Sequence, residues 1–311
     1  MKCKLITPIK WSVLVILLNL TTQFAYSQSA NKLYMAMPDV GPTTKDFIKT
    51  NNIPTVPVLS SKDMSPTGEP KLDVQNFTKA IISHIPDSNA TGYAVIDWEG
   101  KISVNLIFSA QSSDEYQNAL AEYTKAIKLA KQLRPKMTWG FFGLPFQPFK
   151  NDKRQVNVEI PLLNECDAFY PQLYFDYNAD KPNGHRSKSE KDAWISFNLS
   201  NVLAIAQKMG NKPVLGFIWH RYYGGSAAQN LRLIPIPEFD AYIKEVLATN
   251  YNGKSVDGVI WWGVDTYYYS VKTPTLVDEL NSSGTQNFEA YHDALIYKYI
   301  QQVYKVANSP N

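Results

Sequence analysis

One strand-like run that ends in two carboxyl groups limits what this chain can fold into. Residues 93–96 are Tyr-Ala-Val-Ile, and Asp97, Trp98 and Glu99 follow before Gly100. An unbroken apolar run bounded by glycine is typical of a strand covered on both faces, as in a parallel sheet. Because side chains alternate along a strand, Asp97 and Glu99 should face one side, with Cα atoms roughly 6.6 Å apart. Carboxyl groups are costly to bury, so this strand end is a candidate site of acid–base chemistry.

The same triplet also has less specific interpretations. Two carboxylates at a strand end can anchor ion pairs, hold a cation, or stay solvated. The catalytic interpretation therefore depends on what the rest of the chain places near Asp97 and Glu99.

Strand-like runs alternate with helical patterns along the chain. Helices are expected over 72–85, from a capping box at 112–115 to 134, and over 190–209, 237–249 and 291–306. This alternation predicts an α/β fold, namely a TIM-like parallel (β/α) barrel with about seven strands. The strand-like runs are 32–37, 53–59, 92–98, 136–143, 168–175, 213–219 and 256–263.

The start of the chain has the pattern of an export signal. A basic stretch with three lysines precedes an apolar run over 11–20, and a small-x-small cleavage site ends at Ser27. The apolar run is short for a bilayer span, so we expect no stable membrane insertion. The sequence thus predicts a signal peptide at 1–27 and a single catalytic domain at 28–311, secreted or periplasmic.

Removal of that signal would leave a neutral chain with one cysteine. The full sequence has 31 Lys and Arg against 28 Asp and Glu, and since the signal holds three lysines and no acid, 28 of each would remain. Net charge therefore gives no support for a nucleic-acid partner or a polyanion. Cys3 would be lost and Cys166 would have no internal disulfide partner. We expect a monomer.

The sequence contains none of the common cofactor motifs. It has no glycine-rich nucleotide-binding motif, its four histidines are scattered, and no Ser–His–Asp pattern competes with the acidic pair. We therefore expect no cofactor and no metal.

Six motifs follow one another over about residues 90–265. They are V-I-D-W-E at 95–99, L-R-P at 133–135, W-G-F-F-G-L-P at 139–145, F-Y-P-Q-L-Y at 169–174, P-V-L at 213–215 and G-V-I-W-W-G at 258–263. In order and spacing they resemble the hyaluronidase family of glycoside hydrolases, the type of bee venom and vertebrates. The resemblance implies a distorted barrel of about seven strands, and we interpret the chain as a divergent member.

The resemblance implies a retaining endo-hydrolase that cuts a polysaccharide or glycosaminoglycan next to N-acetylhexosamine, in a hyaluronan- or chondroitin-like polymer. The substrate's own acetamido oxygen would attack the anomeric carbon, so no protein nucleophile is required. By this resemblance Glu99 is the general acid and then the base, and Asp97 shares its proton and positions the acetamido group. Tyr174 would hydrogen-bond that group, and Trp262 would form a wall of the pocket.

Other predicted substrate contacts come from an aromatic residue and two loops. Phe142 stands where the family has a tyrosine that touches the acetamido group. Tyr177, Arg221 and Tyr222 lie in loops after predicted strands, where substrate sites of α/β barrels are built, although loop polarity alone also explains Arg221. Two further departures from the family are Gly-Lys-Ile-Ser directly after Glu99, in place of an aromatic residue and Arg-Pro, and the absence of the family's disulfides.

Two alternatives to the hyaluronidase interpretation stay open. The first is a non-catalytic glycan-binding protein on a glycosidase scaffold, and the presence of both Asp97 and Glu99 favours an enzyme over it. The second, raised by Phe142, is a related glycosidase that does not use acetamido assistance.

Overall fold

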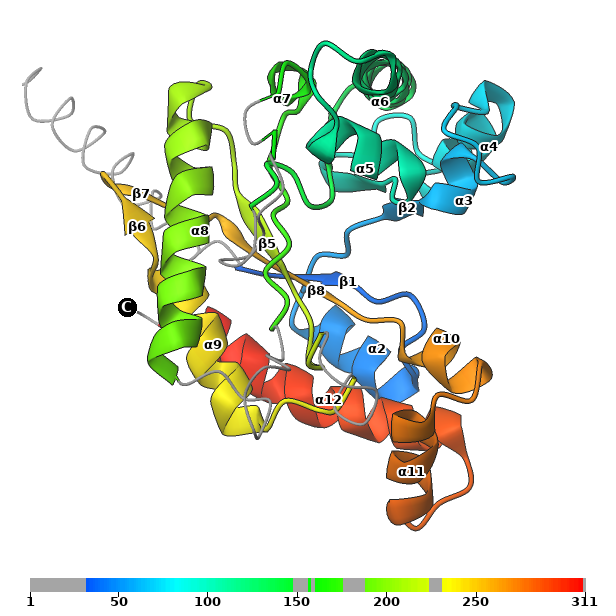
Figure 1. Ribbon diagram of the computed structural model, residues 1–311. Coiled ribbons are helices and arrows are strands. Elements are labelled where there is room, and N and C mark those ends of the chain that lie inside the picture. Colours follow the sequence, from blue (N-terminus) through cyan, green and yellow to red (C-terminus); the bar gives the residue numbers. More distant parts are fainter. Residues whose placement is uncertain (1–31, 148–155, 158–159, 176–187, 224–230, 310–311) are drawn as a thin grey trace, which may run out of the picture. The chain divides into compact units, whose positions relative to one another are not determined.

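Parallel strands alternate with helices through the part of the chain that the structure describes (Figure 1). This computed structural model describes residues 32–147, 156–157, 160–175, 188–223 and 231–309. The strands are β1 (Leu33–Ala36), β2 (Val58–Ser60), β3 (Gly92–Asp97), β4 (Met137–Phe141), β5 (Leu215–Ile218), β6 (Asn250–Tyr251), β7 (Lys254–Ser255) and β8 (Gly258–Trp262). The helices are α2 (Pro42–Thr50), α3 (Ser61–Met64), α4 (Val74–His84), α5 (Lys101–Phe108), α6 (Asp114–Leu133), α7 (Leu162–Glu165), α8 (Lys188–Lys208), α9 (Ile236–Ala248), α10 (Asp265–Ser270), α11 (Pro274–Ser282) and α12 (Phe288–Ala307).

Six of these strands form two parallel sheets, so the predicted α/β class is confirmed. One sheet has the order β2-β3-β4 and the other has the order β1-β8-β5. The register pairs Ser60 with Asp97 in the first sheet and Ala36 with Trp262 in the second. Since all pairs in both sheets are parallel, the carboxyl ends of neighbouring strands lie at the same edge. The short strands β6 and β7 form an antiparallel hairpin just before β8.

The predicted strand at 168–175 is present only as single parallel bridges. Tyr170 bridges to Phe142 after β4, and Gln172 bridges to Phe217 in β5. Pro171 lies between these residues and has no N–H to donate, which interrupts a continuous ladder. A further parallel bridge joins Met35 of β1 to Thr55, just before β2.

Strand β3 is buried on both faces, as its apolar run predicts. Ala94, Val95 and Ile96 are fully buried. The helix α6 buries an apolar stripe that includes Tyr116, Tyr123 and Ile127. The predicted helices at 72–85, 190–209, 237–249 and 291–306 correspond to α4, α8, α9 and α12. None of the helices in the described residues is both long enough and apolar enough to cross a membrane.

Two details around α5 and α6 differ from the sequence analysis. The cap of α6 is Ser113, whose side chain accepts a hydrogen bond from the Tyr116 N–H, and the capping box predicted at Ser112 is therefore wrong by one residue. Helix α5 was not predicted. It begins directly after Gly100, which has φ of 92°, a conformation that glycine adopts at little cost.

Asp293 of the C-terminal helix caps the N-terminus of α2. Its carboxylate accepts hydrogen bonds from the Thr43 N–H (2.9 Å), the Thr44 N–H (2.9 Å) and the Thr44 hydroxyl (2.8 Å). A Cβ on Gly41 would lie 2.4 Å from Cβ of Asp293, so only glycine permits this approach. Burial alone would raise the pKa of Asp293, but the hydrogen bonds from Thr44 and Thr43 lower it below its usual value. The two ends of the described chain are thereby joined.

We expect Asp293→Ala to reduce the free energy of unfolding by about 1–3 kcal/mol at pH 7, because it leaves the first turn of α2 without its cap. A group with a lowered pKa in the folded state stabilises above its unfolded pKa, so part of this difference should vanish as the pH falls below about 4. Urea unfolding at pH 7 and at a pH below about 4 measures the free energy of unfolding of both proteins. Asp46→Ala, at an exposed position of α2, is the control. Equal losses in the two variants would contradict the capping role.

Candidate functional site

A pocket of about 180 Å³ lies where β3, β4, β5 and β8 end. Asp97 is the last residue of β3 and Trp262 is the last residue of β8, while Phe142 and Trp219 follow the ends of β4 and β5. The structure therefore brings together five residues that the sequence predicted for one site. The lining consists of Asp97, Glu99, Phe142, Gln172, Tyr174, Phe217, Trp219, Tyr223, Trp262 and Tyr268.

The backbone around the two acids is held from both sides. Trp98 points away from the pocket and is buried, and its ring stacks on Tyr123 of α6 with centroids 5.3 Å apart and planes at 21°. The Tyr123 hydroxyl donates a hydrogen bond to the Trp98 carbonyl. On another side, the Ser61 hydroxyl accepts from the Glu99 N–H (2.8 Å) and donates to the Asp97 carbonyl (3.2 Å). These contacts hold the backbone from which both carboxyl groups project.

Neither Ser61 nor Tyr123 was predicted to act at the site. Ser61 starts α3 after β2, and it meets the triplet only because β2 pairs with β3. Tyr123 lies on the buried stripe of α6, and the helical spacing of that stripe is the sequence signal that could have indicated its burial.

The two carboxyl groups have raised pKa values. Burial, and then the charge of Glu99, raise the pKa of Asp97 to about 8. One oxygen of Asp97, Oδ1, is buried without a hydrogen-bond partner among the described residues. The Glu99 residue as a whole is exposed, but its carboxyl group is partly buried in the pocket, and this burial also raises its pKa. Near neutral pH the pair therefore holds a proton that one carboxyl can donate while the other accepts.

Tyr174 lies between two aromatic rings beside the acidic pair. Its ring is stacked on Trp262 with centroids 5.5 Å apart and planes at 17°, and it is tilted against Phe142 at 5.9 Å. Burial, and then Asp97 and Glu99, raise the pKa of Tyr174 well above its usual value, so its hydroxyl remains a donor. An aromatic wall next to hydrogen-bonding groups suits a sugar ring, which has an apolar face and a polar edge.

The structure does not bring Arg221 and Tyr222 to this pocket. Arg221 is 1% exposed, and its guanidinium pairs with Asp265 (2.7 Å) and Glu279 (3.0 Å). Tyr222 is also buried, and its hydroxyl donates to Glu238 (2.8 Å). Both residues face structural partners and are absent from the pocket lining. Tyr177, the third predicted loop contact, lies outside the described residues.

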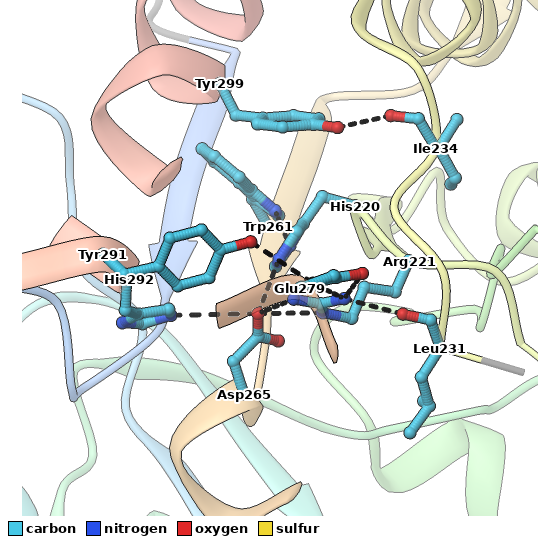
Figure 2. Close-up of polar contacts among 10 residues, drawn as sticks. All are labelled: His220, Arg221, Leu231, Ile234, Trp261, Asp265, Glu279, Tyr291, His292 and Tyr299. Atoms are coloured by element: carbon cyan, nitrogen blue, oxygen red, sulfur yellow. Dashed lines mark hydrogen bonds and ion pairs between the residues drawn. The ribbon is translucent and has the colours of Figure 1, made fainter. Parts of the chain in front are cut away.

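A buried polar network lies next to the strand ends (Figure 2). Asp265, the first residue of α10, has one oxygen that accepts from the Arg221 Nε–H (2.8 Å) and lies 3.2 Å from His220 Nε2. Trp261 Nε1 donates a hydrogen bond to His220 Nδ1 (3.2 Å), so His220 carries its proton on Nε2, and this N–H donates a hydrogen bond to Asp265. Burial would raise the pKa of Asp265, but Arg221 and His220 lower it well below its usual range. Asp265 is therefore a buried carboxylate that joins the ends of β5 and β8 to α10.

Within the described residues, no group of three or more His, Cys, Asp or Glu side chains is arranged to hold a metal ion.

Comparison with known proteins finds hyaluronidases, although no family model matches the chain. A hyaluronidase of Apis mellifera is 23% identical over 233 residues, which cover 61% of this chain and 56% of the relative. An inactive hyaluronidase B of Vespula vulgaris is 23% identical over 273 residues, which cover 72% of this chain and 75% of the relative. The chain thus spans little more than half of the honeybee protein that it matches.

Solved structures of bee venom hyaluronidase have a similar fold. One crystal structure superposes with a TM-score of 0.61 at 17% identity, covering 89% of this chain and 99% of the other. A second, in complex with a hyaluronic acid tetramer, gives a TM-score of 0.57 at 16% identity, with 88% and 99% covered. At this identity the likeness establishes a shared fold.

We expect Asp97→Asn to change the pH dependence of stability. The folded pKa of Asp97, about 8, lies above its ordinary value of 3.8, so wild type loses stability relative to the variant as the pH rises from about 4 to 8. The difference in unfolding free energy should shift in favour of the variant by several kcal/mol across this window, because each unit of pKa shift corresponds to about 1.4 kcal/mol. Urea unfolding at several pH values measures it, with Asp278→Asn at an exposed position of α11 as control. A difference that is independent of pH would show that Asp97 is ionised throughout.

Proposed function

We propose that this chain, a divergent hyaluronidase-like protein, is a glycoside hydrolase that cleaves a polysaccharide containing N-acetylhexosamine. One observation carries the proposal: two carboxyl groups with raised pKa values end a buried strand inside an aromatic-lined pocket. A general acid must hold its proton near the working pH, and burial provides this. The relatives named as hyaluronidases support the reaction class. The bee venom complex with a hyaluronic acid tetramer supports a hyaluronan-like polymer as substrate.

The proposed reaction assigns a role to each of three residues. Glu99, carrying the proton that it shares with Asp97, would protonate the glycosidic oxygen as the bond to the anomeric carbon breaks, which leaves Asp97 ionised as a hydrogen-bond acceptor. The acetamido oxygen of the substrate attacks that carbon from the opposite side. Asp97 accepts a hydrogen bond from the acetamido N–H, and Tyr174 donates a hydrogen bond to the same group. Glu99, now ionised, then removes a proton from the water that opens the cyclic intermediate. Two displacements restore the original configuration, and no protein nucleophile is required.

We infer that the two parallel sheets are parts of one distorted barrel with about seven strands. The single bridges support this, because Met35 links to Thr55 on one side, and residues 170–172 link β4 to β5 on the other. With these bridges each strand of the two sheets has neighbours on both sides. The pocket at the carboxyl ends would then occupy the position at which α/β barrels place their active sites.

We also propose that residues 28–311 are the catalytic domain of an exported monomer. The basic and apolar pattern of residues 1–27 and its small-x-small end support removal of a signal peptide. Cys166 is buried, and this burial is the main reason that the pKa of its thiol is raised to about 12. A thiol in this state is poorly reactive, which suits a fold that works without disulfides in an oxidising compartment.

A non-catalytic glycan-binding protein is the second candidate function. The relative from Vespula vulgaris is named inactive, and this chain is as similar to it as to the honeybee hyaluronidase. The two candidates differ in a reducing-end assay over hyaluronan, chondroitin, chitin oligomers and neutral glycans. New reducing ends from any of these identify an enzyme, whereas binding without new ends identifies a lectin-like role.

We expect Glu99→Gln to lower kcat by about 10²–10⁴-fold, because the variant has no proton to donate to the leaving oxygen. Its thermal midpoint should stay near that of wild type, since Glu99 is open to solvent. The assay is release of reducing ends from the best substrate, and Glu69→Gln, at an exposed position remote in sequence from the pair, is the control. Near-normal turnover of Glu99→Gln would remove Glu99 from the mechanism.

We expect Phe142→Tyr to raise turnover on N-acetylated polymer by about tenfold to a hundredfold. The Phe142 ring lines the pocket 5.9 Å from Tyr174 and 5.0 Å from Phe217, so a hydroxyl added there would give a second donor near the acetamido group. A hydrogen bond to a group that develops charge is worth about 1.5–3 kcal/mol.

A thiazoline mimic of the cyclised intermediate tests the same mechanism in wild type. It should inhibit hydrolysis competitively. If the mimic does not bind and the enzyme cuts glycans that lack N-acetyl groups, acetamido assistance is wrong and the related-glycosidase alternative holds.

A further inference from the structure

Helix α10 carries three consecutive tyrosines at the edge of the pocket. Tyr268 lines the pocket and stacks on Trp219, with ring centroids 6.0 Å apart and planes at 22°. Tyr267 packs against Tyr268 at 5.5 Å with planes at 66°, and its side chain is 60% exposed. An aromatic surface therefore continues from inside the pocket to the outside of the molecule. The mechanism above uses neither tyrosine.

Tyr268 is electrostatically close to the catalytic acid. Burial raises the pKa of Tyr268 above its usual value, and Tyr223, Tyr267 and Glu99 raise it further. A ligand that extends from Glu99 along α10 would meet Tyr268 before Tyr267, because Tyr268 lines the pocket together with Glu99 and Tyr267 does not.

Helix α10 is held rigidly although it has only six residues. At its start, Asp265 is locked by the buried network with His220 and Arg221 (Figure 2). Near its end, Tyr269 stacks on Phe288 of α12 with ring centroids 3.9 Å apart and planes at 2°. Because these contacts already fix the helix, the binding of a ligand to Tyr267 and Tyr268 would cost little conformational entropy in the helix.

The size of the pocket requires that a polymer continue outside it. About 180 Å³ is less than the roughly 300–1,000 Å³ typical of pockets for drug-sized ligands. A polysaccharide chain cut internally would place one ring here and lay its neighbours on the adjoining surface. Aromatic side chains suit these neighbours, since they pack on the apolar face of a sugar ring.

We propose that Tyr267 and Tyr268 form an additional sugar-binding subsite, which stacks on a hexose ring of the same polymer next to the ring held beside Asp97 and Glu99. This inference rests on the proposed function, because it takes its ligand to be the glycan that the pocket cleaves. The continuity of Tyr267 and Tyr268 with Trp219 and Trp262 favours a ring of that same chain as the occupant.

Binding to an inactive protein tests the subsite apart from catalysis. In the Glu99→Gln background, isothermal titration calorimetry gives dissociation constants for hyaluronan and chitin oligosaccharides of four and eight sugars. We expect Tyr267→Ala to raise the dissociation constant of the octasaccharide that binds by about 2- to 10-fold, and to affect the tetrasaccharide less. Tyr267→Phe keeps the ring and should bind like the parent. Tyr251→Ala is the matched control, since Tyr251 is an exposed tyrosine of the β6–β7 hairpin before the amino end of β8.

The outcomes separate the subsite from the proposed function. If wild type releases no reducing ends but Tyr267→Ala still weakens binding, the hydrolase proposal fails and the subsite stands. If wild type is active and Tyr267→Ala binds both oligosaccharides as tightly as Tyr251→Ala does, the subsite is overturned. Failure of every oligosaccharide to bind at millimolar concentration overturns it as well.

Discussion

The burial of Asp97 at the end of β3 is the constraint on which the rest of the site depends. A carboxyl group removed from water keeps its proton, and here the neighbouring Glu99 strengthens the effect. One buried oxygen of Asp97 has no hydrogen-bond partner in the part of the chain that the structure describes, which costs on the order of 1–3 kcal/mol. The burial of the apolar part of β3 offsets this cost, and the anchors at Ser61 and Tyr123 hold the backbone on which both acids stand. Such an unsatisfied group is expected where a substrate completes the hydrogen bonding.

The alternation of side chains along a strand gives each strand end two roles. At the end of β3, Asp97 and Glu99 face the pocket while Trp98 is packed behind them. After β5, Trp219 lines the pocket while the adjacent His220 faces the buried network. At the end of β8, Trp262 lines the pocket while Trp261 donates to His220. The residues behind the pocket therefore determine how the residues inside it are held, which is how a site gains rigidity from the core.

The sequence predicted the acidic pair because it follows an apolar run at the carboxyl end of a parallel strand, whereas its aromatic companions were predicted from the resemblance to hyaluronidases. Asp97, Phe142 and Trp262 end or directly follow strands whose apolar runs are visible in the sequence. Arg221 was instead predicted from its loop position. Its partners Asp265 and Glu279 lie 44 and 58 residues away along the chain, and no local sequence pattern predicts ion pairs over such separations. Pairing that removes a guanidinium from solvent is decided only when distant segments meet.

The sequence by itself determined the α/β alternation, the buried strand with its two acids, and the resemblance on which the proposed reaction rests, because periodicity and motif order are local properties of the chain. The tertiary structure decided which groups are buried together. It placed Ser61 against the Glu99 backbone through the pairing of β2 with β3, and it turned Asp265 into a buried anchor for α10. The physical reason is that desolvation and hydrogen-bond geometry depend on neighbours in space, and these arise from packing between elements far apart in the chain.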